Sequence, residues 1–285
     1  MMTALIAAVL AIHVGAQPTG MTYGAGSLWT ANYGGGTVSR VDPVNHRVVK
    51  TIQVGVQPAA ITFAAGSVWV GDFGAGAVYR LDPASGAITA TITLKSNVGG
   101  LARAPDGSVW VSEYAAGAVD RIDPATNTVA GRTRVGGNAE AIAFAAGKTW
   151  VTNNAGYVTP VDGSGKAGHR IRVAHDVDAI VATPRGLWVA TYDGGVIARI
   201  DPRRAAIVRR VRFDSSAGGI GYFRRKVYVS DYGGGRVLGL DPASGRVLKR
   251  LRVGSEPRDL VLAAGSLWVV EQGSNDVRRI PLRAS

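Results

Sequence analysis

The sequence contains no cysteine and no long apolar run, and these two absences exclude several kinds of protein. Without cysteine the chain has no disulfide framework, no thiolate metal site and no cysteine nucleophile. No apolar stretch approaches the roughly 18 residues that a membrane-spanning helix needs, so no transmembrane segment is expected. Charged residues are few, at 18%, whereas hydrophobic residues make up 46% of the 285 residues. That balance excludes a disordered chain.

Glycine, by contrast, is abundant at 39 residues, and it accompanies an internal repeat. Blocks such as GSLWT at 26–30 and GSVWV at 66–70 recur every 38 to 41 residues. A second block, such as YRLDP at 79–83, follows most of them, and its fourth copy is the degenerate TPVDG at 159–163. The aromatic anchors of the seven repeats are Trp29, Trp69, Trp110, Trp150, Trp188, Tyr228 and Trp268.

Each repeat contains four short runs that alternate between apolar and polar residues and are separated by turn signals, which is typical of β-strands. Four strands about every 40 residues, repeated seven times, predict an all-β fold. The expected architecture is a single seven-bladed β-propeller of four-stranded antiparallel blades. The predicted blades cover about residues 14–53, 54–93, 94–134, 135–172, 173–212, 213–252, and 253–285 together with 3–13. In this scheme the N-terminal strand closes the last blade and removes its open edge.

The N-terminal segment also bears on the compartment. Residues 4–12 form an apolar run, and residues 14–16 loosely fit a signal-peptidase site, although no Lys or Arg precedes the run. As a closing strand, the segment carries no targeting signal and indicates a cytoplasmic protein. The protein is expected to be extracytoplasmic if residues 1–16 are a signal peptide or if an upstream leader is missing from the sequence.

Several conspicuous residues have a structural explanation. The aspartates of the Asp-Pro blocks are expected to shape turns. The net charge of +12 arises largely from arginines in the predicted outer strands, such as Arg209, Arg210 and Arg250. Basic side chains at sheet edges discourage edge-to-edge pairing, which explains the charge. The protein is expected to be a monomer. These strands carry few aromatic residues, which argues against nucleic acid as a partner, while an anionic polymer or membrane headgroups remain open.

Acidic residues gather on the predicted loops of one face of the ring. Of the 20 acidic residues, nine are assigned to these loops: Asp72, Glu113, Glu140, Asp176, Asp178, Asp231, Glu256, Asp259 and Glu271. Aromatic residues follow five of the anchor strands. An acidic funnel edged with tyrosines is therefore predicted, and it would suit a cation, a divalent metal or a polar ligand. The alternative is that these polar residues only satisfy loop backbone and water.

The funnel supplies the candidate site residues. For a Mg²⁺ or Ca²⁺ ion the candidate ligands are Glu256 and Glu271, supported by Asp231, and Arg258 would orient an anionic group. His175 is the histidine on the funnel loops, and it is the candidate general base or metal ligand. The other candidate ligand-binding residues are Asp72, Glu113, Asp176, Asp178, Tyr33, Tyr114, Tyr192 and Tyr232.

The repeat unit P-x-x-I, G-S-L-W-V and R-I-D-P resembles the YVTN-type and the streptogramin (virginiamycin B) lyase-type propellers. WVTNN at 150–154 and DPATNTV at 123–129 are similar to YVTN repeats, while SEPRDL at 255–260 and LWVVEQ at 267–272 are closer to the lyase. The resemblance implies the propeller fold. For the lyase it also implies a magnesium-dependent elimination that opens cyclic depsipeptide antibiotics, with histidines as acid and base.

The chain departs from the lyase pattern at both histidines. Glu256, Pro257 and Glu271 match, but Arg258 and the pair Gly218-Gly219 stand where the resemblance implies the histidines. Arginine, with a pKa above roughly 12, does not serve as a base near neutral pH. The preferred hypothesis is a non-catalytic propeller that binds a small polar ligand or a protein. The alternatives are a magnesium-dependent C–O lyase with a displaced base such as His175, and an extracytoplasmic sensor or surface propeller whose basic edge docks a partner.

Overall fold

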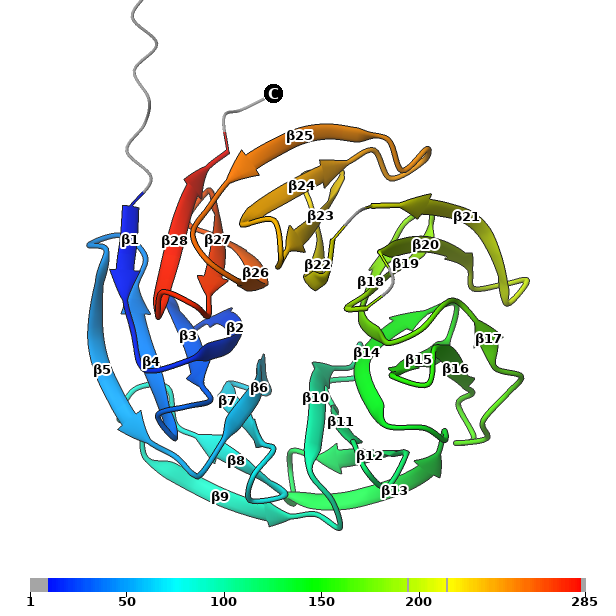
Figure 1. Ribbon diagram of the computed structural model, residues 1–285. Helices are drawn as coiled ribbons and strands as arrows, with labels where there is room; N and C mark the ends of the chain where they lie inside the picture. The colour runs from blue at the N-terminus through cyan, green and yellow to red at the C-terminus, as the bar shows by residue number, and fades with distance from the viewer. Residues whose placement is uncertain (1–9, 194, 214, 283–285) are drawn as a thin grey trace, which may run out of the picture.

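The structure is a computed structural model, and it describes residues 10–193, 195–213 and 215–282. These residues form 28 strands, which pair into seven four-stranded antiparallel sheets. The sheets stand side by side in a ring around a central channel (Figure 1). The described residues contain no helix, and so none that could cross a membrane. The prediction of an all-β, seven-bladed propeller is confirmed.

Each blade runs from an innermost strand at the channel to an outer strand at the rim (Figure 1). The innermost strands are β2 (Pro18–Gly24), β6 (Pro58–Ala64), β10 (Val98–Arg103), β14 (Ala139–Ala145), β18 (Val177–Thr183), β22 (Ala217–Phe223) and β26 (Pro257–Ala263). The second strands, which carry the aromatic anchors, are β3 (Ser27–Asn32), β7 (Ser67–Asp72), β11 (Val109–Glu113), β15 (Lys148–Asn153), β19 (Gly186–Thr191), β23 (Lys226–Asp231) and β27 (Ser266–Glu271).

The third and fourth strands complete the blades. The third strands are β4 (Thr37–Asp42), β8 (Ala77–Leu81), β12 (Ala118–Asp123), β16 (Tyr157–Val161), β20 (Val196–Asp201), β24 (Arg236–Leu240) and β28 (Asp276–Pro281). The outer strands are β5 (Arg47–Gln53), β9 (Ile88–Thr93), β13 (Thr128–Arg134), β17 (Ile171–Arg172), β21 (Ala206–Arg212), β25 (Val247–Arg252) and β1 (Leu10–His13). The outer strand of the fourth blade is the shortest of the set, with two residues.

The ring is closed by its two ends. β1 pairs antiparallel with β28, so that Leu10 lies opposite Arg279 and His13 lies opposite Asp276. The last blade therefore contains three strands from the end of the chain and one from its beginning. The predicted closing strand is confirmed over residues 10–13, while its predicted part at residues 3–9 lies outside the described residues.

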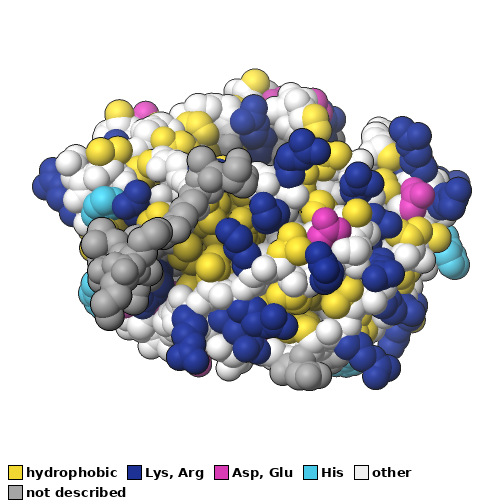
Figure 2. All heavy atoms as spheres, turned by 90° about the horizontal axis from the view of Figure 1, so that it is seen from above, with side chains coloured by type: hydrophobic (Ala, Val, Ile, Leu, Met, Phe, Trp, Pro, Cys, Tyr) yellow, Lys and Arg dark blue, Asp and Glu magenta, His cyan; other side chains and the backbone are white. Residues whose placement is uncertain are grey.

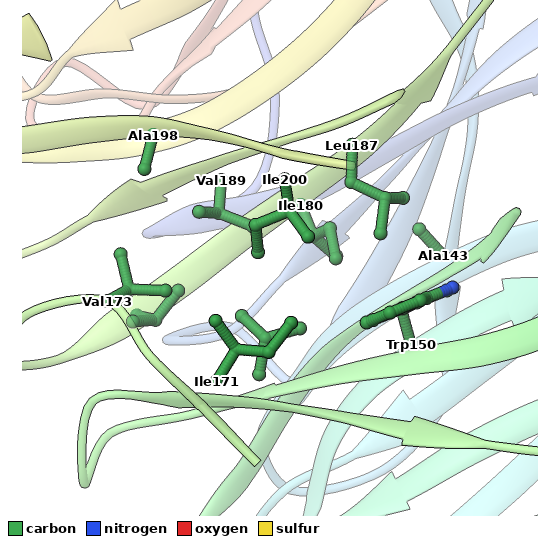
Figure 3. Packing of buried hydrophobic residues seen from close by; sticks show 11 residues of the cluster. Ala143, Trp150, Ile171, Val173, Ile180, Leu187, Val189, Ala198 and Ile200 are labelled. Carbon is green, nitrogen blue, oxygen red and sulfur yellow. The ribbon is translucent and has the colours of Figure 1, made fainter. Parts of the chain in front are cut away.

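The aromatic anchors pack each blade against the next. Five of the tryptophans have no exposed surface, and Tyr228 is 2% exposed. Figure 3 shows one such contact, in which Trp150 and Ile171 of the fourth blade pack with Leu187 and Val189 of the fifth. Residues that alternate along the strands thus form one apolar layer between each pair of blades, which is the main source of stability in a repeat fold.

The Asp-Pro blocks form turns, as expected. The carboxylate of Asp42 accepts hydrogen bonds from the backbone N–H groups of Val44, at 2.8 Å, and Asn45, at 3.0 Å. These bonds stabilise the ionised form and lower the pKa of Asp42 to about 2. Asp82 and Asp241 make the corresponding bonds in their own blades. The repeated aspartates therefore have a structural role.

The outer strands carry much of the positive charge. Lys249, Arg250 and Arg252 are exposed on β25, and Arg209, Arg210 and Arg212 are exposed on β21. Figure 2 looks onto the rim that is uppermost in Figure 1, where β25 and β28 lie, and shows Lys and Arg side chains among apolar ones with few acidic groups. The predicted basic edge is therefore present at the rim.

Candidate functional site

The central channel holds a cavity of about 600 Å³ that is lined mainly by the innermost strands. Small residues dominate the lining, because glycine and alanine occupy most of the second and third positions of these strands. At Gly99 and Gly218 a Cβ atom would lie 2.3 Å from the carbonyl oxygens of Ala139 and Pro257 in the next blades. Glycine is thus required there for adjacent innermost strands to approach one another.

Charged side chains replace the small ones in only part of this repeating pattern. The second positions of the innermost strands are Thr19, Ala59, Gly99, Glu140, Asp178, Gly218 and Arg258. Glu140, Asp178 and Arg258 all line the cavity, as does Asp259 at the third position of β26. The charged groups therefore belong to the fourth, fifth and seventh blades, so the cavity has one polar side.

Arg258 lies between two aromatic rings. Its guanidinium carbon is 5.2 Å from the centre of the Tyr192 ring and 4.8 Å from that of Tyr232. Its Nε atom donates a hydrogen bond of 3.0 Å to Oε1 of Gln272. Contacts of a cation with two aromatic faces hold the guanidinium in one orientation and leave its terminal nitrogens available to an anionic group.

The carboxyl groups of the cavity have raised pKa values. Burial, together with the negative charges of Asp178 and Asp176, raises the pKa of Glu140 to about 9, against the opposing effect of Arg258. Burial raises the pKa of Asp178 to about 6, again opposed by Arg258. At neutral pH Glu140 is therefore protonated and can donate a hydrogen bond, while Asp178 is mostly ionised.

Asp259 is held by the backbone of the first blade. Its carboxylate accepts hydrogen bonds from the N–H groups of Met21, at 2.8 Å, and of Leu260, at 2.7 Å. Burial nevertheless raises the pKa of Asp259 to about 6. This residue connects β26 to β2 at the junction where the ring closes.

Several of the predicted tyrosines line the cavity or contact residues that line it. Tyr33 lines the cavity, and its ring centre is 6.5 Å from that of Phe73, which in turn lies 5.6 Å from Tyr114. The rings of Tyr192 and Tyr232, which both contact Arg258, are 5.3 Å apart. The structure thus brings together predicted residues from separate blades: Tyr33, Tyr192, Tyr232, Asp178 and Arg258.

Four of the predicted loop acids lie elsewhere. Asp72, Glu113, Asp231 and Glu271 are the last residues of their second strands, and none has any exposed surface. The prediction that they lie on open funnel loops is wrong for these four residues. A carboxylate at the end of a buried strand is turned into the protein, where it must find hydrogen-bond donors or a positive charge.

Each of these buried acids has such a partner. Asp72 accepts hydrogen bonds from the N–H groups of Val56, at 2.7 Å, Gln57, at 3.0 Å, and Ala75, at 2.9 Å. The others form ion pairs: Glu113 with Arg132, Asp231 with Arg236, and Glu271 with Arg278. Asp72 and Glu271 thus hold the loops that lead into the innermost strands β6 and β26. Glu113 and Asp231 instead pair with arginines of their own blades.

The proposed metal ligands do not form one site. Glu271 is occupied by Arg278 and by the N–H group of Gly254, and Asp231 is occupied by Arg236. Among residues 10–193, 195–213 and 215–282, no three His, Cys, Asp or Glu side chains are grouped so that they could hold a metal ion. The residues present therefore do not fit the magnesium site that the lyase resemblance implies.

His175 is exposed and is not among the residues that line the cavity. It lies beside Asp176, whose pKa is raised by burial and by Asp193 and lowered by His175. The sequence predicts Glu140 and Asp259 on loops and assigns them no ligand, whereas the structure places both on innermost strands. Aligning the innermost strands position by position could have found them, because small residues occupy the corresponding positions of most other blades.

Comparison with solved structures finds the same fold in other proteins, whereas comparison of the sequence finds no relative. No protein-family model and no curated protein matches the sequence. Among solved structures, a Kuenenia stuttgartiensis hydrazine synthase superimposes with a TM-score of 0.84 at 18% identity, covering 96% of this chain and 98% of that one. A streptogramin B lyase gives 0.84 at 15% identity, covering 95% and 96%. A virginiamycin B lyase from Staphylococcus aureus gives 0.84 at 15% identity, covering 96% and 99%.

These superpositions confirm the sequence-based resemblance to streptogramin lyase-type propellers at the level of the fold. Identities below 20% show the fold alone, since one propeller architecture carries many functions. At the two positions where the resemblance implies histidines, Arg258 and the pair Gly218-Gly219 form part of the cavity lining.

Proposed function

We propose that the protein binds a small polar ligand in the central channel and that Arg258, Asp178 and Glu140 hold it. The observation that carries the proposal is the position of Arg258 between two tyrosine rings, beside carboxyl groups whose pKa values it influences. Elsewhere in the channel the second positions carry small residues, so this grouping is a local exception in the repeat. Such a pocket, with a few convergent polar groups, is typical of ligand sites.

The chemistry of the three side chains defines the ligand class. Arg258 offers donors to a carboxylate or a phosphate. Asp178, with a pKa of about 6, is mostly ionised at neutral pH and would accept hydrogen bonds from an ammonium or hydroxyl group. Protonated Glu140 adds a neutral donor. A small molecule that carries an anionic group at one end and an amine at the other, such as an amino acid or a short peptide, satisfies all three.

Calorimetric titration with a panel of free amino acids and dipeptides tests this function. At least one should bind to the wild type, and Arg258→Ala should weaken that binding by tenfold or more, because it removes the charged partner of the anionic group. The matched control is Arg250→Ala, which removes an exposed arginine of the rim. Equal affinities for both variants would contradict the proposed site.

Elimination chemistry is a second candidate function, favoured by the likeness to the lyases and by the two carboxyl groups with separated pKa values. Such pairs can divide the roles of base and acid. Asp178 would remove a proton next to a carbonyl, and Glu140 would protonate the departing oxygen. A catalytically inactive virginiamycin B lyase has been solved with quinupristin, which makes that compound the substrate to test.

Incubation with quinupristin separates the two candidates. A product of unchanged mass and altered chromatographic retention, formed by the wild type and not by Asp178→Asn, would establish a lyase. Unreacted quinupristin would leave the binding function as the better account. Since no metal site is formed by the described residues, the reaction should proceed equally with and without added Mg²⁺.

A further inference from the structure

Trp110 departs from the packing of the other five tryptophans. Trp29, Trp69, Trp150, Trp188 and Trp268 have no exposed surface, and each indole Nε1 donates a hydrogen bond to a backbone carbonyl, at 3.0 to 3.3 Å. Trp110 is partly exposed. Within the described part of the chain, no protein acceptor receives a hydrogen bond from its Nε1. One anchor of the repeat therefore has an open side.

The cause lies in the turn of the following blade. In the intact repeats this turn covers the indole: a Cβ atom on Gly245 would lie 2.9 Å from the Trp188 ring, and the His46 ring lies 6.1 Å from that of Trp268. The blade that follows Trp110 is the fourth. Its turn lies in the degenerate block TPVDG, where Gly163 replaces the usual proline. A Cβ atom on Gly163 would meet nothing within 4 Å, and Gly163 and Trp110 line the same cavity.

Two adjoining cavities occupy this space between the third and fourth blades. One, of about 350 Å³, is lined by Trp110, Arg121, Arg132 and Ser164, and the other, of about 380 Å³, by Trp110, Pro105 and Phe144. Both include Trp110 and Asp106 in their walls. The indole thus separates a polar compartment from an apolar one, and we refer to both together as the Trp110 cleft.

The two arginines of the Trp110 cleft are already paired with carboxylates. Arg121 and Asp106 form an ion pair of 3.0 Å, and Arg132 is bound to Asp120 at 3.0 Å and to Glu113. The carboxylate of Asp162 accepts hydrogen bonds from Ser164. Because both arginines already have carboxylate partners, neither is free to select an anion. The Asp106–Arg121 ion pair and the Ser164 hydroxyl can still exchange hydrogen bonds with an uncharged ligand.

We propose that the Trp110 cleft binds a neutral saccharide. A pyranose ring has an apolar face of C–H groups and an edge of hydroxyl groups. The indole of Trp110 offers a flat apolar surface to the first, and the Asp106–Arg121 pair with Ser164 offers donors and acceptors to the second. This site is distinct from the central channel, since the two cavities share no lining residue with it.

Tryptophan fluorescence with iodide quenching tests the proposal. Because Trp110 is the one tryptophan that is not fully buried, it should dominate the quenchable signal. Titration with maltotriose, cellotriose and chitotriose should protect it from iodide in a saturable way for at least one sugar. Gly163→Leu, which adds a side chain to the wall of the cavity that Trp110 lines, should weaken binding at least tenfold without loss of fold.

Two further variants make the outcome decisive. Trp110→Phe should remove the quenchable signal, and calorimetry should then show at least tenfold weaker saccharide binding. Arg258→Ala, which alters the central channel, should leave saccharide binding unchanged, so that failure of one site is distinguishable from failure of the other. Absence of saturable protection by all three sugars at 10 mM (about a hundredfold above a 0.1 mM dissociation constant) would overturn the proposal. So would undiminished binding by Gly163→Leu.

Discussion

The Nε atom of Arg80 donates a hydrogen bond of 2.9 Å to the hydroxyl of Ser67. The same guanidinium lies over the Trp69 ring, at 5.0 Å, and reaches the backbone of Pro124 in the next blade, at 2.6 Å. The corresponding bond to serine recurs at Arg40 in the first blade and at Arg279 in the last. The serine of the anchor block and the arginine of the Asp-Pro block thus form one unit that fixes blade to blade.

Replacing the serine tests this unit. Ser67→Ala leaves the Nε group of a half-buried arginine without its acceptor, and the free energy of unfolding should fall by about 1–2 kcal/mol. Chemical denaturation, followed by far-UV circular dichroism, measures the change. The fifth blade supplies the comparison: Gly186 replaces the serine there, and the Nε atom of Arg199 is buried without a partner. If Ser67→Ala unfolded with the same free energy as the wild type, the unit would contribute nothing to stability.

The repeat made the fold predictable, because the anchors, Asp-Pro turns and strand count depend on local pattern alone. Even the closing strand followed from comparing residues 7–13 with 47–53. The orientation of the acidic side chains at the ends of the second strands, toward solvent or into the protein, was not predictable from local pattern. Whether Glu271 faces solvent or turns inward depends on Arg278 in the neighbouring strand. To predict that Glu140 and Asp259 line the channel, one must know which positions of the innermost strands face the axis of the ring.

The buried carboxylate of Asp72 provides the next prediction. It accepts three backbone hydrogen bonds, so Asp72→Ala leaves three donors without an acceptor and should lower stability by about 2–4 kcal/mol. Asp72→Asn keeps one acceptor oxygen, as Asn32 and Asn153 do at the corresponding ends of β3 and β15, and should cost about half as much. Thermal unfolding of the two variants measures the difference. Equal stability of Asp72→Ala and wild type would instead favour the original assignment of Asp72 to a ligand.

The raised pKa values of the carboxyl groups in the channel predict that the free energy of unfolding depends on pH. The folded protein binds the proton of Glu140 up to about pH 9, whereas the unfolded chain releases it near the ordinary value of 4.5. Since the folded state binds more protons in this interval, the free energy of unfolding should fall as the pH rises. Asp178 and Asp259 add to the decline below about pH 6. Between pH 6 and 9 the slope should come mainly from Glu140.

Glu140→Gln isolates that contribution, because the amide has nearly the same shape and does not titrate. Urea unfolding of wild type and variant at pH 6, 7.5 and 9 gives the difference at each pH. The variant should gain stability relative to wild type as the pH rises through this range. A constant difference across the range would mean that Glu140 ionises normally in the folded protein.

The last prediction concerns the close approach of the sixth and seventh blades. A Cβ atom on Gly218 would lie 2.3 Å from the carbonyl oxygen of Pro257, and that contact is with backbone that no side-chain rotation can relieve. Gly218→Ala should therefore push β22 away from β26 and destabilise the protein by about 1–3 kcal/mol. It should also weaken ligand binding in the channel, since Arg258 follows Pro257 directly on β26.

Gly131→Ala is the matched control, because a Cβ atom there meets nothing within 4 Å. Gly218→His would meet the same obstacle, so a histidine at this position requires a different spacing of the two blades. Full stability and unchanged ligand affinity in Gly218→Ala would show that the blades can separate at no cost.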